Sequence, residues 1–148
     1  MAWASAQFYN PTEVNLDSNG YVYVADINNH LIRKISPSGM VSTVAGVAMM
    51  SGYVDGTSGT ARFYSPHGVV VDTVGNIYVA EYNNHLIRKI SPSGVVSTVA
   101  GVATMSGVVD GSGATAKFHY PTSIAVDISG NLFVVDYSNN RIRKITPI

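Results

Sequence analysis

The pattern of apolar and polar positions along the chain is that of short β-strands separated by turns. Residues 68–72 (GVVVD) form a short apolar run, which is typical of a strand buried on both faces. Residues 77–81 (IYVAE), 85–90 (HLIRKI) and 95–100 (VVSTVA) are rich in β-branched residues, which favour strands. The intervening turns are short, so we expect these four segments to form an antiparallel meander.

The residues between the expected strands are those that turns require. Gly75 can take a positive φ between the first two strands. Residues 82–84 (YNN) are expected to make the next turn, because asparagine tolerates the left-handed region. Residues 101–120 are long, glycine-rich and weakly patterned, with Asp110-Gly111 as a turn signal. This segment is interpreted as a connector to the next group of strands.

The same pattern recurs at intervals of 55 residues. Residues 28–39 return unchanged as 83–94 and, altered, as 138–147. The repeats run over residues 8–62, 63–117 and 118–148, and the first two are identical at about two thirds of their positions. The third copy stops before a fourth strand. A fixed period of this kind is typical of a repeat architecture.

Antiparallel units of four strands in series predict a β-propeller. A small sheet with apolar residues on both faces cannot bury them alone, whereas neighbouring sheets can cover one another. We therefore expect an all-β fold in which residues 1–148 form a single propeller segment of about three blades. The last blade would lack its outer strand, and the first strand of each blade would lie nearest the axis.

The repeated segments resemble a known family. Residues 66–72, 75–81 and 84–90 are similar to the NHL repeat, which is named for its Asn-His-Leu tripeptide. The tripeptide is present as Asn29-His30-Leu31 and as Asn84-His85-Leu86, and the third copy has Asn139-Asn140-Arg141 instead. The long connectors with Asp55-Gly56 and Asp110-Gly111 look like a long-connector variant of this repeat.

This resemblance implies a propeller, most often of six blades, that usually serves as a scaffold for protein or RNA partners. It also implies a minority alternative, because some members of the family are enzymes, such as amidating lyases and strictosidine-synthase-like proteins.

Composition narrows the range of partners. The formal net charge is zero, with nine basic and nine acidic residues, which disfavours nucleic acid and anionic lipid as partners. There is no cysteine, so disulfides and thiolate chemistry are excluded. No apolar run is long enough for a membrane helix, and the first residues do not look like a signal peptide. The compartment stays undetermined, with an extracellular location open if a longer precursor carried a signal.

The histidines do not predict a metal site. His30 and His85 occupy equivalent places in successive repeats, too dispersed to share one metal ion, so we expect them to support the turns. His67 and His119 precede the first strand of their repeats, where propeller ligands usually bind. Neither has the converging ligands that a metal ion needs. No metal and no cofactor are therefore expected.

The recurring carboxylates favour structure over catalysis. A catalytic pair is needed once, whereas a carboxylate that accepts backbone N–H groups in a turn is needed in every repeat. We expect such a role after the first strand for Asp17, Asp72 and Asp127, and after the second strand for Asp26, Glu81 and Asp136. No catalytic residue is predicted.

Seven of the nine basic residues lie in the expected third strands, namely Arg33, Lys34, Arg88, Lys89, Arg141, Arg143 and Lys144. Acidic residues close the preceding strand, across the same hairpin. Cross-strand pairing therefore explains the basic residues more simply than RNA binding does.

A few unrepeated polar and aromatic residues are candidates for binding. Glu13 and Asn15 interrupt the first apolar strand of the first copy, either because they face a central channel or because the end of the array tolerates them. Tyr82 and Tyr137 are expected at exposed turn tips, where tyrosine suits contact with a partner. With His67 and His119, these residues are the predicted binding set.

Three blades cannot close a propeller, which needs four to eight. Two chains would supply six blades, so we expect a homodimeric ring. An open filament and a fragment of a longer repeat protein are the alternatives. The predicted function is a non-enzymatic module that associates with itself and acts as a structural or protein-binding scaffold. The alternative from a different class is a metal-dependent lyase or hydrolase on the same fold.

Overall fold

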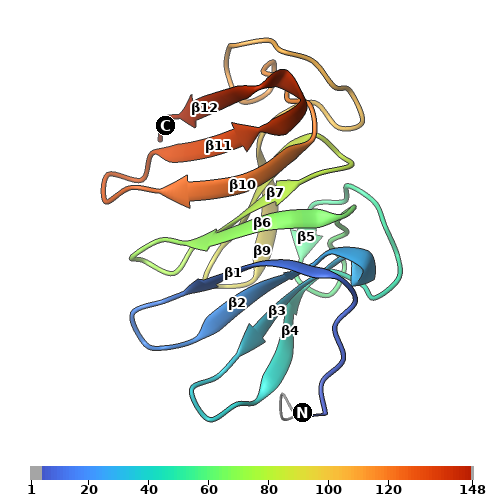
Figure 1. Ribbon diagram of the computed structural model, residues 1–148, viewed down its shortest axis with the longest axis vertical. Coiled ribbons are helices and arrows are strands. Elements are labelled where there is room, and N and C mark those ends of the chain that lie inside the picture. Colours follow the sequence, from blue (N-terminus) through green and yellow to red (C-terminus); the bar gives the residue numbers. More distant parts are fainter. Residues whose placement is uncertain (1–4, 148) are drawn as a thin grey trace.

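The computed structural model describes residues 5–147, which form three antiparallel sheets (Figure 1). Blade 1 contains β1 (Pro11–Leu16), β2 (Val22–Asp26), β3 (Leu31–Ile35) and β4 (Val41–Ala45). Blade 2 contains β6 (Pro66–Val71), β7 (Ile77–Glu81), β8 (Leu86–Ile90) and β9 (Val95–Ala100), with a short strand β5 (Gly56–Thr57). Blade 3 contains β10 (Pro121–Val126), β11 (Leu132–Asp136) and β12 (Arg141–Ile145).

The strands of each blade follow one another in chain order, as a meander requires. One-turn 3-10 helices, η1 (Ile27–Asn29) and η2 (Tyr137–Asn139), join the second strand to the third in blades 1 and 3. Gly75 has a φ of 90° in the first hairpin of blade 2, as expected. The predicted all-β propeller segment is confirmed, and within residues 5–147 the third blade has three strands.

The connector between blades 1 and 2 contributes a strand that the sequence pattern does not predict. β5 pairs antiparallel with β9, through Gly56 opposite Val96 and Thr57 opposite Val95. Two residues are too few to produce a detectable alternation. As a result, the outer strand β9 lies between β8 and the connector that precedes its own blade.

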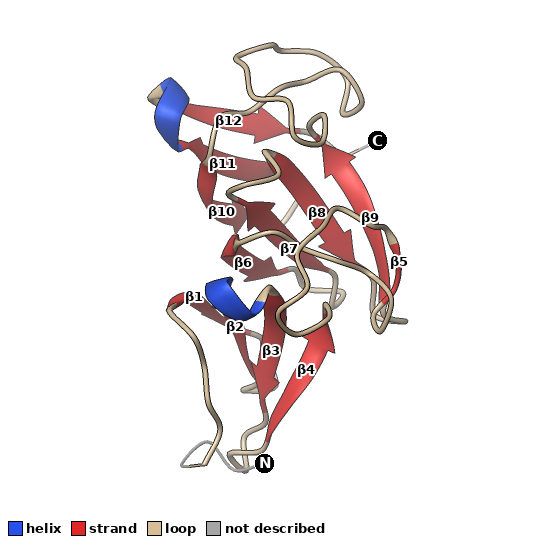
Figure 2. Cartoon of the chain, turned by 90° about the vertical axis from the view of Figure 1, so that its right-hand side faces the viewer, coloured by secondary structure: helices blue, strands red, loops and turns tan. Residues whose placement is uncertain are grey.

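The first strands of the three blades lie side by side along the inner edge of the molecule (Figure 1). Thr12 Oγ1 donates to the carbonyl of His67 at 2.8 Å, and Nδ1 of His67 lies 2.9 Å from the carbonyl of Thr122. Gly68 permits this approach, because a Cβ there would lie 2.7 Å from the same Thr122 oxygen. Figure 2 shows β1 and β6 on one side of the molecule and β4 and β9 on the other.

The apolar core lies between blades. The cluster between blades 1 and 2 contains Tyr23, Ala25, Ile32 and Ala45 from blade 1, and Ala61, Phe63, Val69, Ile77, Val79, Ile90 and Val96 from the connector and blade 2. The cluster between blades 2 and 3 contains Val70, Ala80, Ile87, Ala100, Ala116, Phe118, Ile124, Leu132 and Val134. Each blade is therefore stabilised by burying its faces against its neighbours. Within residues 5–147 no helix has the length and apolarity needed to cross a membrane.

Candidate functional site

A buried polar network lies at the centre of blade 2. Glu81 ends β7, and Arg88 lies two positions into β8, so the two side chains meet across the hairpin. Both side chains are fully buried. Arg88 also donates to Asp55 of the connector, with Nη2 and Oδ1 2.6 Å apart. The side-chain amide of Asn84 donates to Glu81 and to the carbonyl of Gly52.

Burial and pairing act in opposite directions on Glu81. Burial raises the pKa of this carboxyl to about 7, because water no longer solvates its charge. The charge of Arg88 and hydrogen bonds from the Tyr64 N–H, Arg88 and Asn84 lower the pKa and offset part of that shift. The network is therefore a structural ion pair whose acid can take up a proton near neutral pH.

Blade 3 repeats the network, with Asp136 in the place of Glu81. Arg143 lies 3.0 Å from Asp136, at the end of β11, and 2.6 Å from Asp110 of the connector. The Asn139 amide donates to Asp136 at 2.7 Å. The Asp110 side chain is 85% exposed, whereas its counterpart Asp55 is 49% exposed.

Blade 1 holds an incomplete version of the same network. Arg33 lies 3.5 Å from Asp26 and donates weakly to the carbonyl of Gln7 at 3.4 Å. Its Nε is buried and has no hydrogen-bond partner within residues 5–147. Among residues 5–147, no connector carboxylate contacts Arg33 in the way that Asp55 contacts Arg88.

The repeated phenylalanines complete these networks. The guanidinium of Arg33 lies over the ring of Phe8, that of Arg88 over Phe63 and that of Arg143 over Phe118, at 5.4, 5.3 and 4.9 Å from the ring centres. The expected pairing of basic residues with acidic residues across the hairpin is thus confirmed for these three arginines. It is wrong for two lysines, which lie over aromatic rings instead: Lys34 over Tyr21 and Lys144 over Phe133.

The histidine of the tripeptide joins one blade to the next. His30 and His85 have φ of 58° and 59°. The left-handed residue is therefore the histidine, although the sequence predicts that the asparagines before it take this conformation. Nδ1 of His30 accepts the N–H of Ser65, and Nδ1 of His85 accepts that of Tyr120, each at 3.1 Å. Burial lowers the pKa of both imidazoles. The neutral ring with a free Nδ1 lone pair is the form that accepts these bonds.

The carboxylates after the first strands lie in the hairpin turns. Oδ1 of Asp17 accepts the N–H groups of Asn19 and Tyr21 at 2.9 and 3.0 Å. Asp72 and Asp127 make the same pair of bonds in their own turns. These side chains saturate backbone donors in every blade.

Glu13 and Asn15 lie on the inner edge, where they cover the neighbouring blade. Glu13 accepts the N–H of Val69 at 2.9 Å and the hydroxyl of Ser123 at 2.7 Å, so it contacts all three inner strands. Asn15 Oδ1 accepts the N–H of Val71 at 3.3 Å. The two side chains thus satisfy alternate N–H groups along the open edge of β6.

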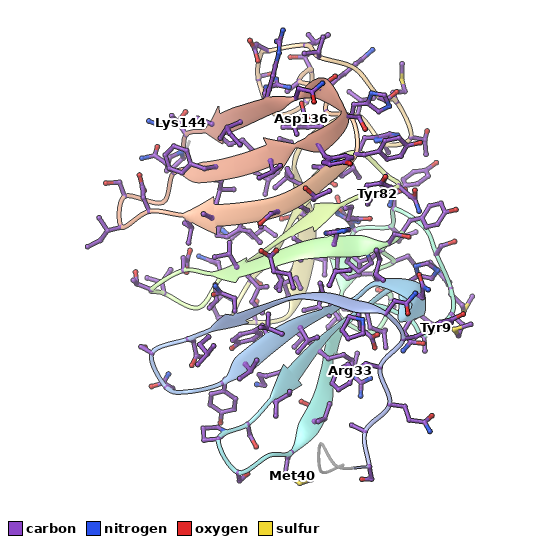
Figure 3. All side chains as sticks on the ribbon, viewed as in Figure 1. Tyr9, Arg33, Met40, Tyr82, Asp136 and Lys144 are labelled. Atoms are coloured by element: carbon purple, nitrogen blue, oxygen red, sulfur yellow. The ribbon has the colours of Figure 1, made fainter. Side chains whose placement is uncertain are left out.

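The aromatic candidates gather at the end of the molecule where the inner strands begin. Tyr82 is half-buried rather than at an exposed tip, because its ring stacks on Tyr120 with centres 4.5 Å apart. The ring centres of His67 and Tyr82 are 5.8 Å apart, and those of His119 and Tyr120 are 4.8 Å apart. Figure 3 shows Tyr82 at this edge and Lys144 at the opposite one. Tyr137 is exposed, as expected for a turn tip.

The structure therefore brings His67, Tyr82 and His119 into one row and places Glu13 and Asn15 along the inner edge. Within residues 5–147 no three His, Asp or Glu side chains form a group that could hold a metal ion. The polar residues that sequence reasoning missed are Asp55 and Asp110. Their signal is the Asp-Gly pair at a 55-residue interval, which predicts a turn and resembles the long-connector repeat but does not predict an ion pair.

Comparison with known proteins agrees with this geometry. The family model described as "NHL repeat" matches residues 63–90 and 118–145, each from the stacked phenylalanine to the end of the third strand. NHL repeat-containing protein 2 of Bos taurus is 30% identical over 151 residues, a match that covers 93% of this chain and 21% of that protein. The chain belongs to the NHL-repeat family.

Other similar proteins differ in what their names say of activity. Peptidyl-alpha-hydroxyglycine alpha-amidating lyase 1 of Drosophila melanogaster is 36% identical, over 70% of this chain and 19% of that protein. A solved structure of a structural genomics protein of unknown function from Bacteroides thetaiotaomicron superposes with a TM-score of 0.86 and 29% identity, over 97% of this chain and 37% of that one. The chain thus spans about a fifth of the length of these two curated relatives.

Proposed function

We propose that this chain is a non-enzymatic NHL-repeat module that associates head to tail with a second copy, so that two chains form a six-bladed ring. The ring would serve as a structural or protein-binding scaffold. One observation supports the proposal. The outward faces of blade 1 and blade 3 expose apolar side chains, whereas the equivalent side chains are buried where neighbouring blades pack together within the chain.

The outer face of blade 1 is the first of these surfaces. Val14 is 58% exposed, whereas its equivalent Val69 in blade 2 is 1% exposed because blade 1 covers it. Leu16 is exposed as well, beside a small cluster of Val24, Ile35 and Val41. An apolar face of this kind is costly to leave in water.

The outer face of blade 3 is the complementary surface. Ile142 is 67% exposed, whereas its equivalents Ile32 and Ile87 are fully buried against the following blade. Phe133 is exposed on the same blade. Blade 3 therefore presents the type of face that blades 1 and 2 bury against a neighbour.

The interface between blades 1 and 2 indicates how two copies would meet. Ile32 and Val69 belong to one apolar cluster there. Head-to-tail packing would bring Ile142 against the partner's Val14 in the same way. Such an interface joins different patches, so it closes a ring if the rotation closes and otherwise builds a filament. With three blades per chain, two copies supply the six blades that a closed propeller accommodates.

The test is the mass in solution, measured by light scattering across a concentration series. We expect twice the chain mass of 15.7 kDa. Ile142→Glu or Val14→Lys should each give monomers, and an equimolar mixture of the two variants should restore a dimer. In that mixture one junction pairs Glu with Lys while the other keeps isoleucine and valine.

Ile128→Glu is the matched control, since this residue is exposed in a hairpin turn where the other copies have Ser18 and Thr73. It should leave the mass unchanged. A wild-type monomer would refute the self-association, and an open series of larger masses would refute the ring in favour of a filament.

The non-enzymatic part of the proposal is supported by the place of the polar residues. The buried carboxylates and arginines recur blade by blade and satisfy one another or the backbone, which is a structural arrangement. Elemental analysis of the purified protein tests the alternative. Stoichiometric, tightly held zinc or calcium would favour a metal-dependent lyase or hydrolase instead.

A further inference from the structure

The two connectors between blades expose apolar side chains at the same three positions. Each position of the first connector recurs 55 residues later in the second. We call each set a connector triad: Met50, Tyr53 and Val54 between blades 1 and 2, and Met105, Val108 and Val109 between blades 2 and 3. These six residues are all between 45% and 56% exposed.

This exposure belongs to the connector itself and not to its place in the array. The first connector has a neighbouring connector on the side of blade 3, and the second has one on the side of blade 1 (Figure 1). The triads are almost equally exposed in these two different settings. A neighbouring connector therefore does not cover a triad.

Both triads are held in one conformation by the same backbone hydrogen bonds. Three N–H groups of each connector region donate to equivalent carbonyls at 2.9–3.1 Å. The pairs are Met49 to Asn29, Gly52 to Phe63 and Arg62 to Val54 in the first connector, and Thr104 to Asn84, Gly107 to Phe118 and Lys117 to Val109 in the second. The apolar side chains are thus presented by an ordered loop.

One cation lies beside each triad. A Cβ on Gly52 would lie 3.1 Å from the side-chain carbons of Arg62, and a Cβ on Gly107 would lie 3.0 Å from those of Lys117. The apolar stem of each basic residue therefore packs on the glycine inside the triad. Neither charged group makes an ion pair within residues 5–147.

The carboxylates next to the triads do not neutralise these cations. Asp55 and Asp110 directly follow the triads in sequence. They pair instead with Arg88 and Arg143, each at 2.6 Å. Each triad is therefore an apolar surface with an unpaired positive charge at its side.

The two triads face the same end of the molecule. Successive blades of a propeller are related by rotation about its axis, so equivalent residues lie at the same height along that axis. Figure 1 shows both connectors toward the right, whereas the hairpins between first and second strands lie at the left. One flat surface could therefore contact both triads together, whereas a globular protein partner would have to repeat its own site at the same spacing.

We propose that the connector triads dock this chain onto the surface of a phospholipid bilayer. The methionine, tyrosine and valine side chains enter the boundary between headgroups and acyl chains, and Arg62 and Lys117 extend to the lipid phosphates. Because the formal net charge is zero, apolar contact supplies most of the binding. The inference goes beyond the proposed scaffold and does not depend on ring formation, because one chain carries both triads.

The probe is a series of vesicles of phosphatidylcholine, alone or mixed with phosphatidylserine, sedimented with the wild-type protein. We expect association with both kinds of vesicle, and stronger association with the mixed ones. Hydrogen–deuterium exchange on the vesicles should slow in residues 46–54 and 101–109. It should stay unchanged in the hairpin turns 72–76 and 127–131.

Matched pairs of exposed residues test the location. Tyr53→Ser with Val108→Ser removes apolar surface from both triads and should weaken association with phosphatidylcholine about tenfold. Val74→Ser with Ile128→Ser is the control, since these apolar residues are exposed in the hairpin turns at the opposite end. The control pair should bind as the wild-type protein does, and circular dichroism should show that both pairs keep the fold.

A second pair of substitutions tests the cations. Arg62→Gln with Lys117→Gln should keep the association with phosphatidylcholine and abolish the preference for vesicles that contain phosphatidylserine. A preference that survives this change would overturn the role given to the two basic residues.

The docking proposal is overturned by an absence of association at millimolar lipid, by equal binding of the triad and control pairs, or by slowed exchange in the hairpin turns. It is also overturned if the triad pair changes the mass in solution, because the triads would then contact a second copy of the chain. Val14→Lys leaves both triads intact and should still bind vesicles. Failure of the ring and failure of the docking are thus measured separately.

Discussion

Arg33 and Arg88 are the same residue at equivalent positions of two blades, yet their surroundings differ, so the same substitution should have unequal effects. Methionine at either position removes the guanidinium and keeps an apolar stem of similar length. Arg88 is fully buried and donates to Asp55, Glu81 and two backbone carbonyls. Arg33 has one ion pair at 3.5 Å and one weak bond, and its Nε is already without a partner within residues 5–147.

The expected magnitudes follow from these contacts. Removing one partner of a buried ion pair costs about 3–5 kcal/mol, since the other charge stays buried. We therefore expect Arg88→Met to lower the free energy of unfolding by about 3 kcal/mol near pH 6, because Glu81 can be protonated there. For Arg33→Met we expect a smaller cost of about 1–2 kcal/mol, because the ion pair is long at 3.5 Å and the buried Asp26 keeps hydrogen bonds from the Tyr9 N–H and from Asn29.

The Arg88→Met deficit should also grow with pH. Burial raises the folded-state pKa of Glu81 to about 7, above its unfolded value. Stability linked to this group is complete below the unfolded pKa and is lost as pH rises through the folded pKa. Without Arg88 the charged carboxylate has no counterion, so the loss between pH 6 and pH 8.5 should be larger than in wild type.

Urea unfolding followed by circular dichroism at pH 6 and pH 8.5, at one protein concentration, measures both effects. Arg33→Met is the matched control, with the same chemistry at the equivalent position. Equal costs for the two substitutions, or an Arg88→Met deficit that shrinks at high pH, would refute the reasoning about the networks.

Three further predictions concern the blade contacts. Burial lowers the pKa of His30 and His85, so their contribution to stability is present above pH 6.5 and is lost as pH falls. Replacing both with asparagine, the residue of the third copy, should leave the fold intact and flatten stability between pH 7.5 and pH 5; an unchanged slope would contradict this. Gly68→Ala should cost about 1–3 kcal/mol in urea unfolding, because its Cβ would lie 2.7 Å from a carbonyl of blade 3; a neutral effect would show that the inner strands can separate. Burial and Asp17 raise the pKa of Tyr23 to about 12, so stability linked to this group is lost as pH rises from 10 to 12. Tyr23→Phe should reduce the loss of stability between pH 10 and pH 12, measured by thermal unfolding. A loss equal to that of the wild-type protein would show that a different group causes it.

The strands and their order could be predicted because they depend on local chemistry. Residues 77–81 and 95–100 form β7 and β9 with the predicted bounds, since β-branched runs between short turns have few other solutions. β5 could not be predicted, because two residues carry no periodicity and its pairing with β9 depends on where the connector crosses the blade.

The candidate site was harder to predict than the fold. Tyr82 was expected at an exposed tip, yet it is half-buried because Tyr120, from the next blade, stacks on it. Asp55 is 33 residues from Arg88, so nothing in the local pattern pairs them. The turn after β7 was expected to use the left-handed tolerance of Asn83 and Asn84, whereas His85 takes that conformation and accepts a hydrogen bond from the next blade.

By itself, the sequence determined the repeat of 55 residues and the antiparallel meander. Those properties follow from periodicity and turn chemistry, which act over a few residues and are the same in every copy. The family came from the resemblance of the repeated segments to the NHL repeat. Only the tertiary structure decided which polar side chains are satisfied and which apolar faces are covered. These depend on the neighbouring blade, and a blade at the end of the array has a neighbour on one side only, so near-identical repeats differ in what they expose.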